Sequence, residues 1–172
     1  MGNLEQSDRL SSRWAELTQE RSLQSVPYKI ELNAWGKLEM SPASYRHGLL
    51  QGLLIGELSR QLGGGTVLGE VPILTDIGVR VPDLAWISHV RMAALGDVSP
   101  LPRAPELCVE IVSPSDSEVE IREKTRAYLA AGAQEVWIVA EEGTTRYFDL
   151  HGEQAGSLFK VEIALPKPPR AS

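Results

Sequence analysis

The sequence predicts a single α/β domain in which helices flank a central mixed β-sheet and a hairpin lies near the N-terminus. Three observations lead to this prediction. The chain has 172 residues, a length that suits one domain. Its hydrophobic share of 42% and charged share of 23% are those of an ordinary folded protein. Short apolar runs typical of strands are interspersed with two longer segments of helical period.

The first third of the chain predicts an extension, a hairpin and a helix. Residues 1–27 are polar, with a short helical candidate around Trp14 to Glu20, and we expect the first ten residues to be mobile. From Tyr28 to Met40, YKIEL and KLEM alternate apolar and polar residues around NAWG, which predicts the hairpin. Ser44 to Leu62 carries leucines at steps of three and four before a GGG stop, which predicts an amphipathic helix.

The central segments predict strands followed by a second helix. TVLGEVPIL and VRVPDLAWI, separated by TDIG, predict two paired strands, and a proline-rich loop follows at 96–105. ELCVEIV is a nearly continuous apolar run, as expected for a strand covered on both faces. The S-x-x-E patterns that begin at Ser115 and Ser117 each match a helix start, so we expect a helix from here to Gly132.

The last third predicts further strands and a free end. VWIVA and TRYFDL, joined by EEGT, predict a hairpin, and LFKVEIA predicts a weaker final strand. The folded domain is therefore expected over residues 28–163. We expect the tail at 164–172, which contains PKPPRAS, to be disordered.

Composition restricts the location and partners of the protein. No apolar run approaches the roughly 20 residues of a membrane-spanning helix, and the polar start lacks the apolar centre of a signal peptide. We therefore expect a cytoplasmic protein with no membrane contact. A single cysteine, Cys108, excludes an intrachain disulfide and a cysteine-rich zinc site. The net charge of −6 has the wrong sign for binding nucleic acid by bulk electrostatics, but residues 104–142 account for this excess with nine carboxylates and three basic residues.

Two carboxylates interrupt apolar strands, Asp83 in VRVPDLAWI and Glu110 in LCVEIV. A buried carboxylate without a partner costs on the order of several kcal/mol, so a fold that keeps two of them supplies cations, hydrogen-bond donors or a metal ion. A metal ion explains both carboxylates at once. Hard divalent ions such as magnesium bind carboxylate oxygens together with water and phosphate.

Lys124 is the candidate ammonium group of this site. It lies three residues after Ile121 and four before Tyr128, on the same helical stripe as these two packing residues. Because this helix directly follows the strand of Glu110, we expect the lysine to return over the end of that strand toward both carboxylates.

Three further side chains are candidates for supporting roles. Glu70, on the preceding strand, is either a supporting carboxylate or a solvent-facing residue. His47, at the start of the first helix, either contacts substrate or a carboxylate, or serves as a capping or surface residue. Ser113 lies close enough in sequence to reach a metal-bound water, although capping of the next helix together with Asp116 is the simpler interpretation.

The combination of these motifs resembles a known family. GKLEMSPASYRHG, VRVPDLAWIS, APELCVEIVSPSDS and EKTRAYLAAGAQEVWIV occur in this order, and they are similar to the Uma-type putative restriction endonucleases, formerly a domain of unknown function. The resemblance covers most of the chain, from Tyr28 to Leu150. It implies a restriction-endonuclease-like αβββαβ core of the PD-(D/E)XK superfamily, cleavage of phosphodiester bonds in DNA with magnesium or manganese, and a homodimer.

The resemblance also implies roles for individual residues. Asp83 corresponds to the PD aspartate and Glu110 to the (D/E) carboxylate, both metal ligands, and the peptide carbonyl of Ile111 is a further candidate ligand. The superfamily lysine normally stands two residues after the glutamate, where this chain has Val112. Lys124 stands where the family usually has its lysine, so we expect it to supply the ammonium. It would orient a metal-bound water or offset charge on the phosphorane.

Two other functions compete with an endonuclease. A catalytically inactive nuclease-fold dimer, acting as a binding or regulatory protein, is favoured by the acidic balance and by Val112. A nucleotide or small-molecule hydrolase with the same metal site would suit an acidic surface. However, the chain lacks a phosphate-binding motif, because GGG at 63–65 is not followed by G-K-[ST].

Overall fold

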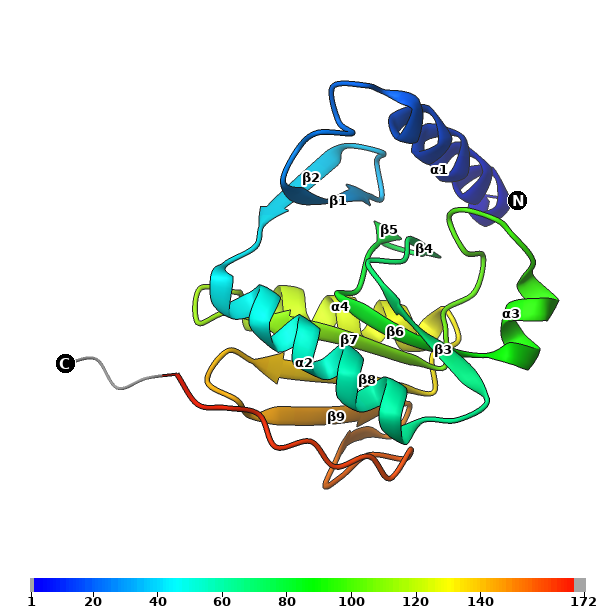
Figure 1. Cartoon of the computed structure of the whole chain (residues 1–172). Helices are drawn as coiled ribbons and strands as arrows, with labels where there is room; N and C mark the ends of the chain where they lie inside the picture. The colour runs from blue at the N-terminus through cyan, green and yellow to red at the C-terminus, as the bar shows by residue number, and fades with distance from the viewer. Residues whose placement is uncertain (1, 169–172) are drawn as a thin grey trace.

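The computed structural model describes residues 2–168 and places helices around two β-sheets (Figure 1). A six-stranded sheet has the order β10-β9-β8-β7-β6-β3, and a four-stranded sheet has the order β2-β1-β5-β4. Within these sheets β7 and β8 run parallel and every other neighbouring pair of strands is antiparallel, so the larger sheet is mixed. In chain order the elements are α1 (Gly2–Gln19), β1 (Tyr28–Asn33), β2 (Leu38–Pro42), α2 (Tyr45–Gln61), β3 (Gly65–Gly69), β4 (Ile73–Thr75), β5 (Gly78–Arg80), β6 (Leu84–Ser88), α3 (His89–Leu95), β7 (Leu107–Val112), α4 (Glu118–Ala130), β8 (Glu135–Ala140), β9 (Thr145–Asp149) and β10 (Gly152–Gln154).

Helices α2 and α4 cover opposite faces of the six-stranded sheet, as Figure 1 shows. The leucines of α2 pack on one face, against alternate residues of β7 and β8 that include Val109 and Trp137. Ile121 and Tyr128 of α4 pack on the other face, against Cys108 and Val136. This confirms the two predicted helices and the predicted mixed sheet. Because side chains alternate along a strand, Glu110 shares the α4-facing side of β7 with Cys108.

The two long strands predicted between residues 66 and 87 are each divided in two. β3 pairs with β6 in the larger sheet, whereas β4 pairs with β5 in the smaller sheet. Pro72 and Pro82 lie in the two breaks, where the missing amide hydrogen prevents a continuous ladder. Glu70, in the first break, has a positive φ of 48°. Asp83 therefore lies at the crossing from one sheet to the other, and not within a strand as expected.

The N-terminal helix is longer than predicted. Instead of a short helix around Trp14, α1 begins at Gly2 and so includes residues that the sequence predicted to lie outside a helix. The reason is an apolar stripe of Leu10, Trp14 and Leu17 at helical spacing, which is buried against β1 and β5 in a small second core. Because the rest of the segment is mostly polar, this stripe stabilises the helix only when the smaller sheet covers it.

The segment LFKVEIA does not form the predicted strand. The chain ends its last ladder at β10 and then crosses the α2-facing side of the larger sheet without strand pairing, where Phe159, Val161 and Ile163 pack at alternate positions. The alternation of apolar and polar residues therefore shows that one side of this extended segment is buried, but not that the segment pairs with a strand. Residues 164–168 have no helix or strand, and 169–172, the rest of the expected tail, lie outside the described residues. No helix within 2–168 is long and apolar enough to cross a membrane.

Candidate functional site

Three carboxylates and two lysines meet on the α4-facing side of the larger sheet. Glu110 comes from β7, Asp83 from the crossing between β5 and β6, and Glu31 from β1. All three side chains are buried, with exposed fractions of 5%, 1% and 4%. Lys29 of β1 and Lys124 of α4 supply the positive charges between them. The structure therefore brings together the three residues predicted to form the site, and adds two that were not predicted.

The carboxylate of Asp83 is held from three directions. Its Oδ2 accepts a hydrogen bond of 2.7 Å from the backbone amide of Ile111, on the neighbouring strand. Its Oδ1 accepts one of 2.7 Å from Lys29 and lies 3.2 Å from Nε2 of His47. Burial by itself raises the pKa of Asp83, but the hydrogen bond from His47 and the charge of Lys29 outweigh burial and lower the pKa to about 2. Asp83 is thus held in its ionised form.

Glu110 has a different balance of contacts. Its Oε1 accepts a hydrogen bond of 2.7 Å from the Tyr128 hydroxyl and lies 3.6 Å from Nζ of Lys124, while its Oε2 accepts one of 3.1 Å from Lys29. Burial raises the pKa of Glu110 above its usual value, against the opposing attraction of the two lysines. Burial also raises the pKa of Tyr128, so its hydroxyl remains a hydrogen-bond donor.

Lys124 points into the site, as expected, but its closest partner is not one of the predicted carboxylates. Its Nζ lies 2.8 Å from Oε2 of Glu31 and 3.6 Å from Oε1 of Glu110, and within the described residues it forms no ion pair with Asp83. Burial lowers the pKa of Lys124, but attraction by Glu110 and Glu31 outweighs this effect and leaves the pKa above its ordinary value. The lysine is therefore a fixed cation between two carboxylates.

Lys29 and Glu31 are the site residues that the sequence reasoning missed. They lie two positions apart on β1, so their side chains share one face of the strand. Lys29 bridges Asp83 and Glu110, while Glu31 receives Lys124 and also accepts a hydrogen bond of 2.8 Å from the backbone amide of Val81. The alternation in YKIEL indicates that the two residues share a face. It does not reveal that this polar face turns toward the interior.

The supporting candidates have separate outcomes. His47 joins the site through Asp83. The amide of Ile111, rather than its carbonyl, makes the contact that the structure records. Glu70 is exposed, and it is its backbone amide that contacts the backbone carbonyl of Asp83, at 3.3 Å. Ser113 donates to Asp116 at 2.9 Å in the turn before α4, whose N-cap residue is Ser117 without a side-chain capping bond.

The donor set has the composition that a hard divalent cation requires, but only two carboxylates converge on one point. Oδ1 of Asp83 and Oε2 of Glu110 both contact the same atom, Nζ of Lys29. Two carboxylate oxygens around one positive charge are suitable ligands for magnesium, which completes its coordination with water or phosphate. Within residues 2–168 there is no group of three or more His, Cys, Asp or Glu side chains arranged to hold a metal ion.

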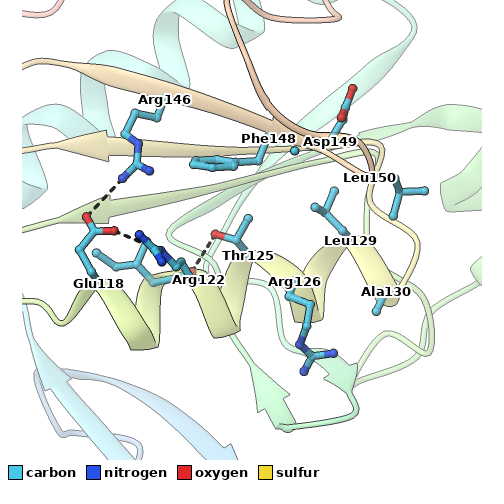
Figure 2. Close-up of a pocket in the computed structure, with 12 residues that line it drawn as sticks. Glu118, Arg122, Thr125, Arg126, Leu129, Ala130, Arg146, Phe148, Asp149 and Leu150 are labelled. Carbon is cyan, nitrogen blue, oxygen red and sulfur yellow. Dashed lines mark hydrogen bonds and ion pairs between the residues drawn. The ribbon is translucent and has the colours of Figure 1, made fainter.

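A separate cavity is lined by residues of α4 and of the β9–β10 hairpin, as Figure 2 shows. It has a volume of about 350 Å³ between α4 and the β9–β10 hairpin. Ile121, Leu129 and Phe148 form its apolar part, and the guanidinium carbon of Arg146 lies 5.0 Å from the centroid of the Phe148 ring. None of the three carboxylates of the site lines this cavity, so the cavity is separate from the proposed site.

Comparison with solved structures supports the class of fold. The chain is similar to the crystal structure of a putative nuclease belonging to DUF820 from Anabaena variabilis, with a TM-score of 0.59 and 18% identity over 79% of this chain and 86% of that one. This similarity shows a nuclease-like α/β fold. A second similarity, to a DrdV–DNA complex, has a TM-score of 0.43 and 14% identity over 87% of this chain but 12% of that one, which is too low to support an argument.

Comparison of sequences then identifies the family. The profile of the Uma2 family, described as putative restriction endonuclease, matches residues 14–162. The chain belongs to this family. No curated protein matches the chain.

Proposed function

We propose that this protein is a DNA endonuclease that depends on magnesium or manganese, with Asp83 and Glu110 as metal ligands and Lys124 as the ammonium group beside them. Membership of the Uma2 family supports the nuclease activity. The observation that carries the rest is the convergence of Asp83 Oδ1 and Glu110 Oε2 on one position, with Lys124 3.6 Å from the other oxygen of Glu110. The carbonyl of Ile111 remains a candidate for a further ligand.

The neighbours of the two carboxylates determine which of their oxygens are directed at the ion. The Ile111 amide holds Oδ2 of Asp83 and the Tyr128 hydroxyl holds Oε1 of Glu110. Each bond fixes one oxygen and leaves the other, Oδ1 or Oε2, turned toward the shared position. Asp83 and Glu110 would hold a divalent ion here, which would supply a water of lowered pKa and a positive charge beside the scissile phosphate. Tyr128 and the β7 backbone are therefore positioning groups.

Lys124 and His47 act on charge next to this position. Glu31 holds the Lys124 ammonium at 2.8 Å, in a partly buried place where an ammonium can stabilise negative charge on a phosphate oxygen. His47 contacts Asp83 at 3.2 Å and orients that carboxylate. The proposed site does not include the carboxylate of Glu70 or the hydroxyl of Ser113.

Cleavage of supercoiled plasmid and of single-stranded DNA in the presence of magnesium or manganese tests this function. We expect the wild-type protein to convert the plasmid to open and linear forms, and Asp83→Ala and Lys124→Ala to be slower by roughly 100-fold or more, as expected when a group that stabilises transition-state charge is removed. Glu70→Gln is the matched control and should retain activity. Equal cleavage by all four proteins would indicate a contaminating nuclease and would remove the proposal.

We also propose that the protein acts as a homodimer, since two copies related by a two-fold axis would present their sites in the opposite directions of the two strands of a duplex. Light scattering coupled to size-exclusion chromatography measures the molar mass directly. A monomer at the concentrations at which plasmid is linearised would contradict this part of the proposal.

The second candidate function is an inactive nuclease-fold protein that binds DNA or regulates another protein. The ion pairs of Lys29 and Lys124 favour it, because they already compensate the buried carboxylates without a metal ion. DNA binding measured by fluorescence anisotropy, without cleavage under any metal condition, would support this candidate over the enzyme.

A further inference from the structure

Lys29 occupies an unusual place for a strand lysine. Its side chain is only 11% exposed, and its Nζ lies 2.7 Å from Oδ1 of Asp83 and 3.1 Å from Oε2 of Glu110. These are the two oxygens that the Ile111 amide and the Tyr128 hydroxyl do not bind, and Oδ1 of Asp83 also lies 3.2 Å from Nε2 of His47. The ammonium therefore lies at the point on which the two proposed metal ligands converge.

Ammonium and metal ion cannot share this point. A divalent ion binds carboxylate oxygens at about 2.0 to 2.6 Å, shorter than either contact of Lys29, so the ion and Nζ would nearly coincide. Two positive charges at such a separation repel strongly where burial excludes water. The buried carboxylates also have cationic partners without an ion, because Lys29 bridges Asp83 and Glu110 and Lys124 faces Glu31. His47 adds a contact to Asp83, and Arg80 lies between Glu31 and Glu39.

We propose that Lys29 is a tethered cation that occupies the position of the divalent metal ion, so that the metal binds only when the Lys29 ammonium withdraws. This inference rests on the metal ligands of the proposed function, and it adds an element that competes with the metal from within the same chain. Lys124 does not have this role. Its closest contact is with Glu31, and its contact with Glu110 is to Oε1, the oxygen directed away from the shared position.

Within the described part of the chain, the first residues of β1, where Lys29 lies, pair with one neighbouring strand only. β1 pairs with β5 only at Leu32 and Asn33, whereas Lys29 is paired only with Ser41 of β2. The open end of the β1–β2 hairpin, which carries Lys29, therefore has no described strand of the smaller sheet other than β2 beside β1. Figure 1 shows the hairpin extending away from β4 and β5. Withdrawal of the ammonium requires a rotation of one side chain or a shift of a two-stranded ribbon, and not a rearrangement of the core.

Manganese binding measures this competition without reference to cleavage. The free manganese signal in electron paramagnetic resonance, recorded during titration of the full-length protein, gives the dissociation constant for wild type, Lys29→Met and Lys124→Met. We expect Lys29→Met to bind manganese roughly tenfold more tightly or better, because the apparent affinity of a site rises as the fraction in which it is open rises. Lys124→Met removes the same charge from the same cluster and is the matched control, with a smaller gain.

Several outcomes would overturn the inference. The first is an equal manganese affinity in wild type and Lys29→Met. The second is an equal gain in manganese affinity in Lys29→Met and Lys124→Met, which would indicate a general effect of charge. The third is no manganese binding by any of the three proteins. If Lys29→Met does not fold alone, manganese should restore its far-ultraviolet circular dichroism to that of wild type, and failure to do so counts against the inference. Tighter binding by Lys29→Met together with no cleavage by wild type or variant would remove the nuclease proposal and leave the competition intact.

Discussion

The hydrogen bond from Tyr128 to Glu110 permits a quantitative test of how the site is built. Tyr128 is fully buried, and its hydroxyl donates to Oε1 of Glu110 at 2.7 Å. The substitution Tyr128→Phe keeps the ring and removes the donor. Water cannot replace the lost partner easily in so buried a place, and a hydrogen bond to a charged group contributes about 1.5 to 3 kcal/mol. We expect the free energy of unfolding to fall by that amount, which lowers the melting temperature by roughly 3 to 12 °C for a chain of this size.

Urea unfolding followed by circular dichroism measures this loss, provided that the dependence on urea concentration is the same in both proteins. Tyr147→Phe is the matched control: Tyr147 packs edge-on against Trp137 with ring centroids 5.3 Å apart, a contact that phenylalanine retains. We expect the control to change stability by less than about 0.5 kcal/mol. A loss of that small size for Tyr128→Phe would refute the reasoning. So would an undiminished loss in a Glu110→Met background, which has no carboxylate or amide oxygen to accept the bond, because the bond would then not be the cause.

Three other predictions concern the fold and the surroundings of the site. Gly78→Ala should lower the free energy of unfolding by on the order of 3 kcal/mol or more, because its Cβ would lie 2.0 Å from a carbonyl oxygen of β1. Gly152→Ala, also at positive φ but with open space around it, should cost about 1 to 2 kcal/mol. Similar losses for the two variants in urea unfolding would contradict the steric argument. Trp14→Ala should cost about 3 to 5 kcal/mol, since Trp14 is 8% exposed in the core between α1 and the smaller sheet, and a loss under 1 kcal/mol would mean that α1 is not docked as described. The hydrogen bond to Asp83 raises the pKa of His47 above 6.5, so the stability that it contributes is fully present below about pH 6.5 and is lost as the pH rises through the folded-state value. His47→Gln should therefore flatten the dependence of unfolding free energy on pH in that range, and an unchanged profile would show that His47 is not the titrating group.

Patterns that are local in the chain predicted much of the fold. The leucine spacing before GGG predicted α2 almost to the residue, and the apolar run LCVEIV predicted β7 as a strand covered on both sides. These predictions are confirmed because one face of a helix or strand is defined by residues within a few positions of one another. The apolar stripe of α1 was local too, but only three large residues carry it within a polar segment.

Patterns that depend on distant contacts were not decided by the sequence. Pro72 and Pro82 are local signs of a break in the strands around Glu70 and Asp83, but nothing local shows that the two halves of each strand join different sheets. The alternation after Ser157 predicted a strand where the chain packs on the face of a sheet instead. In both cases the local pattern shows which side is buried, and the neighbour that buries it comes from elsewhere in the chain.

The sequence by itself determined the family, the two helices that cover the larger sheet, and the carboxylates and lysine from which the proposed site is made. Only the tertiary structure decided how their charges are paired. Lys29 lies 54 residues before Asp83 and 81 before Glu110, and Glu31 faces Lys124 from the same strand. Electrostatic pairing acts through space over a few ångströms, so no pattern along the chain could show that a lysine of the first hairpin lies between two carboxylates of the central sheet.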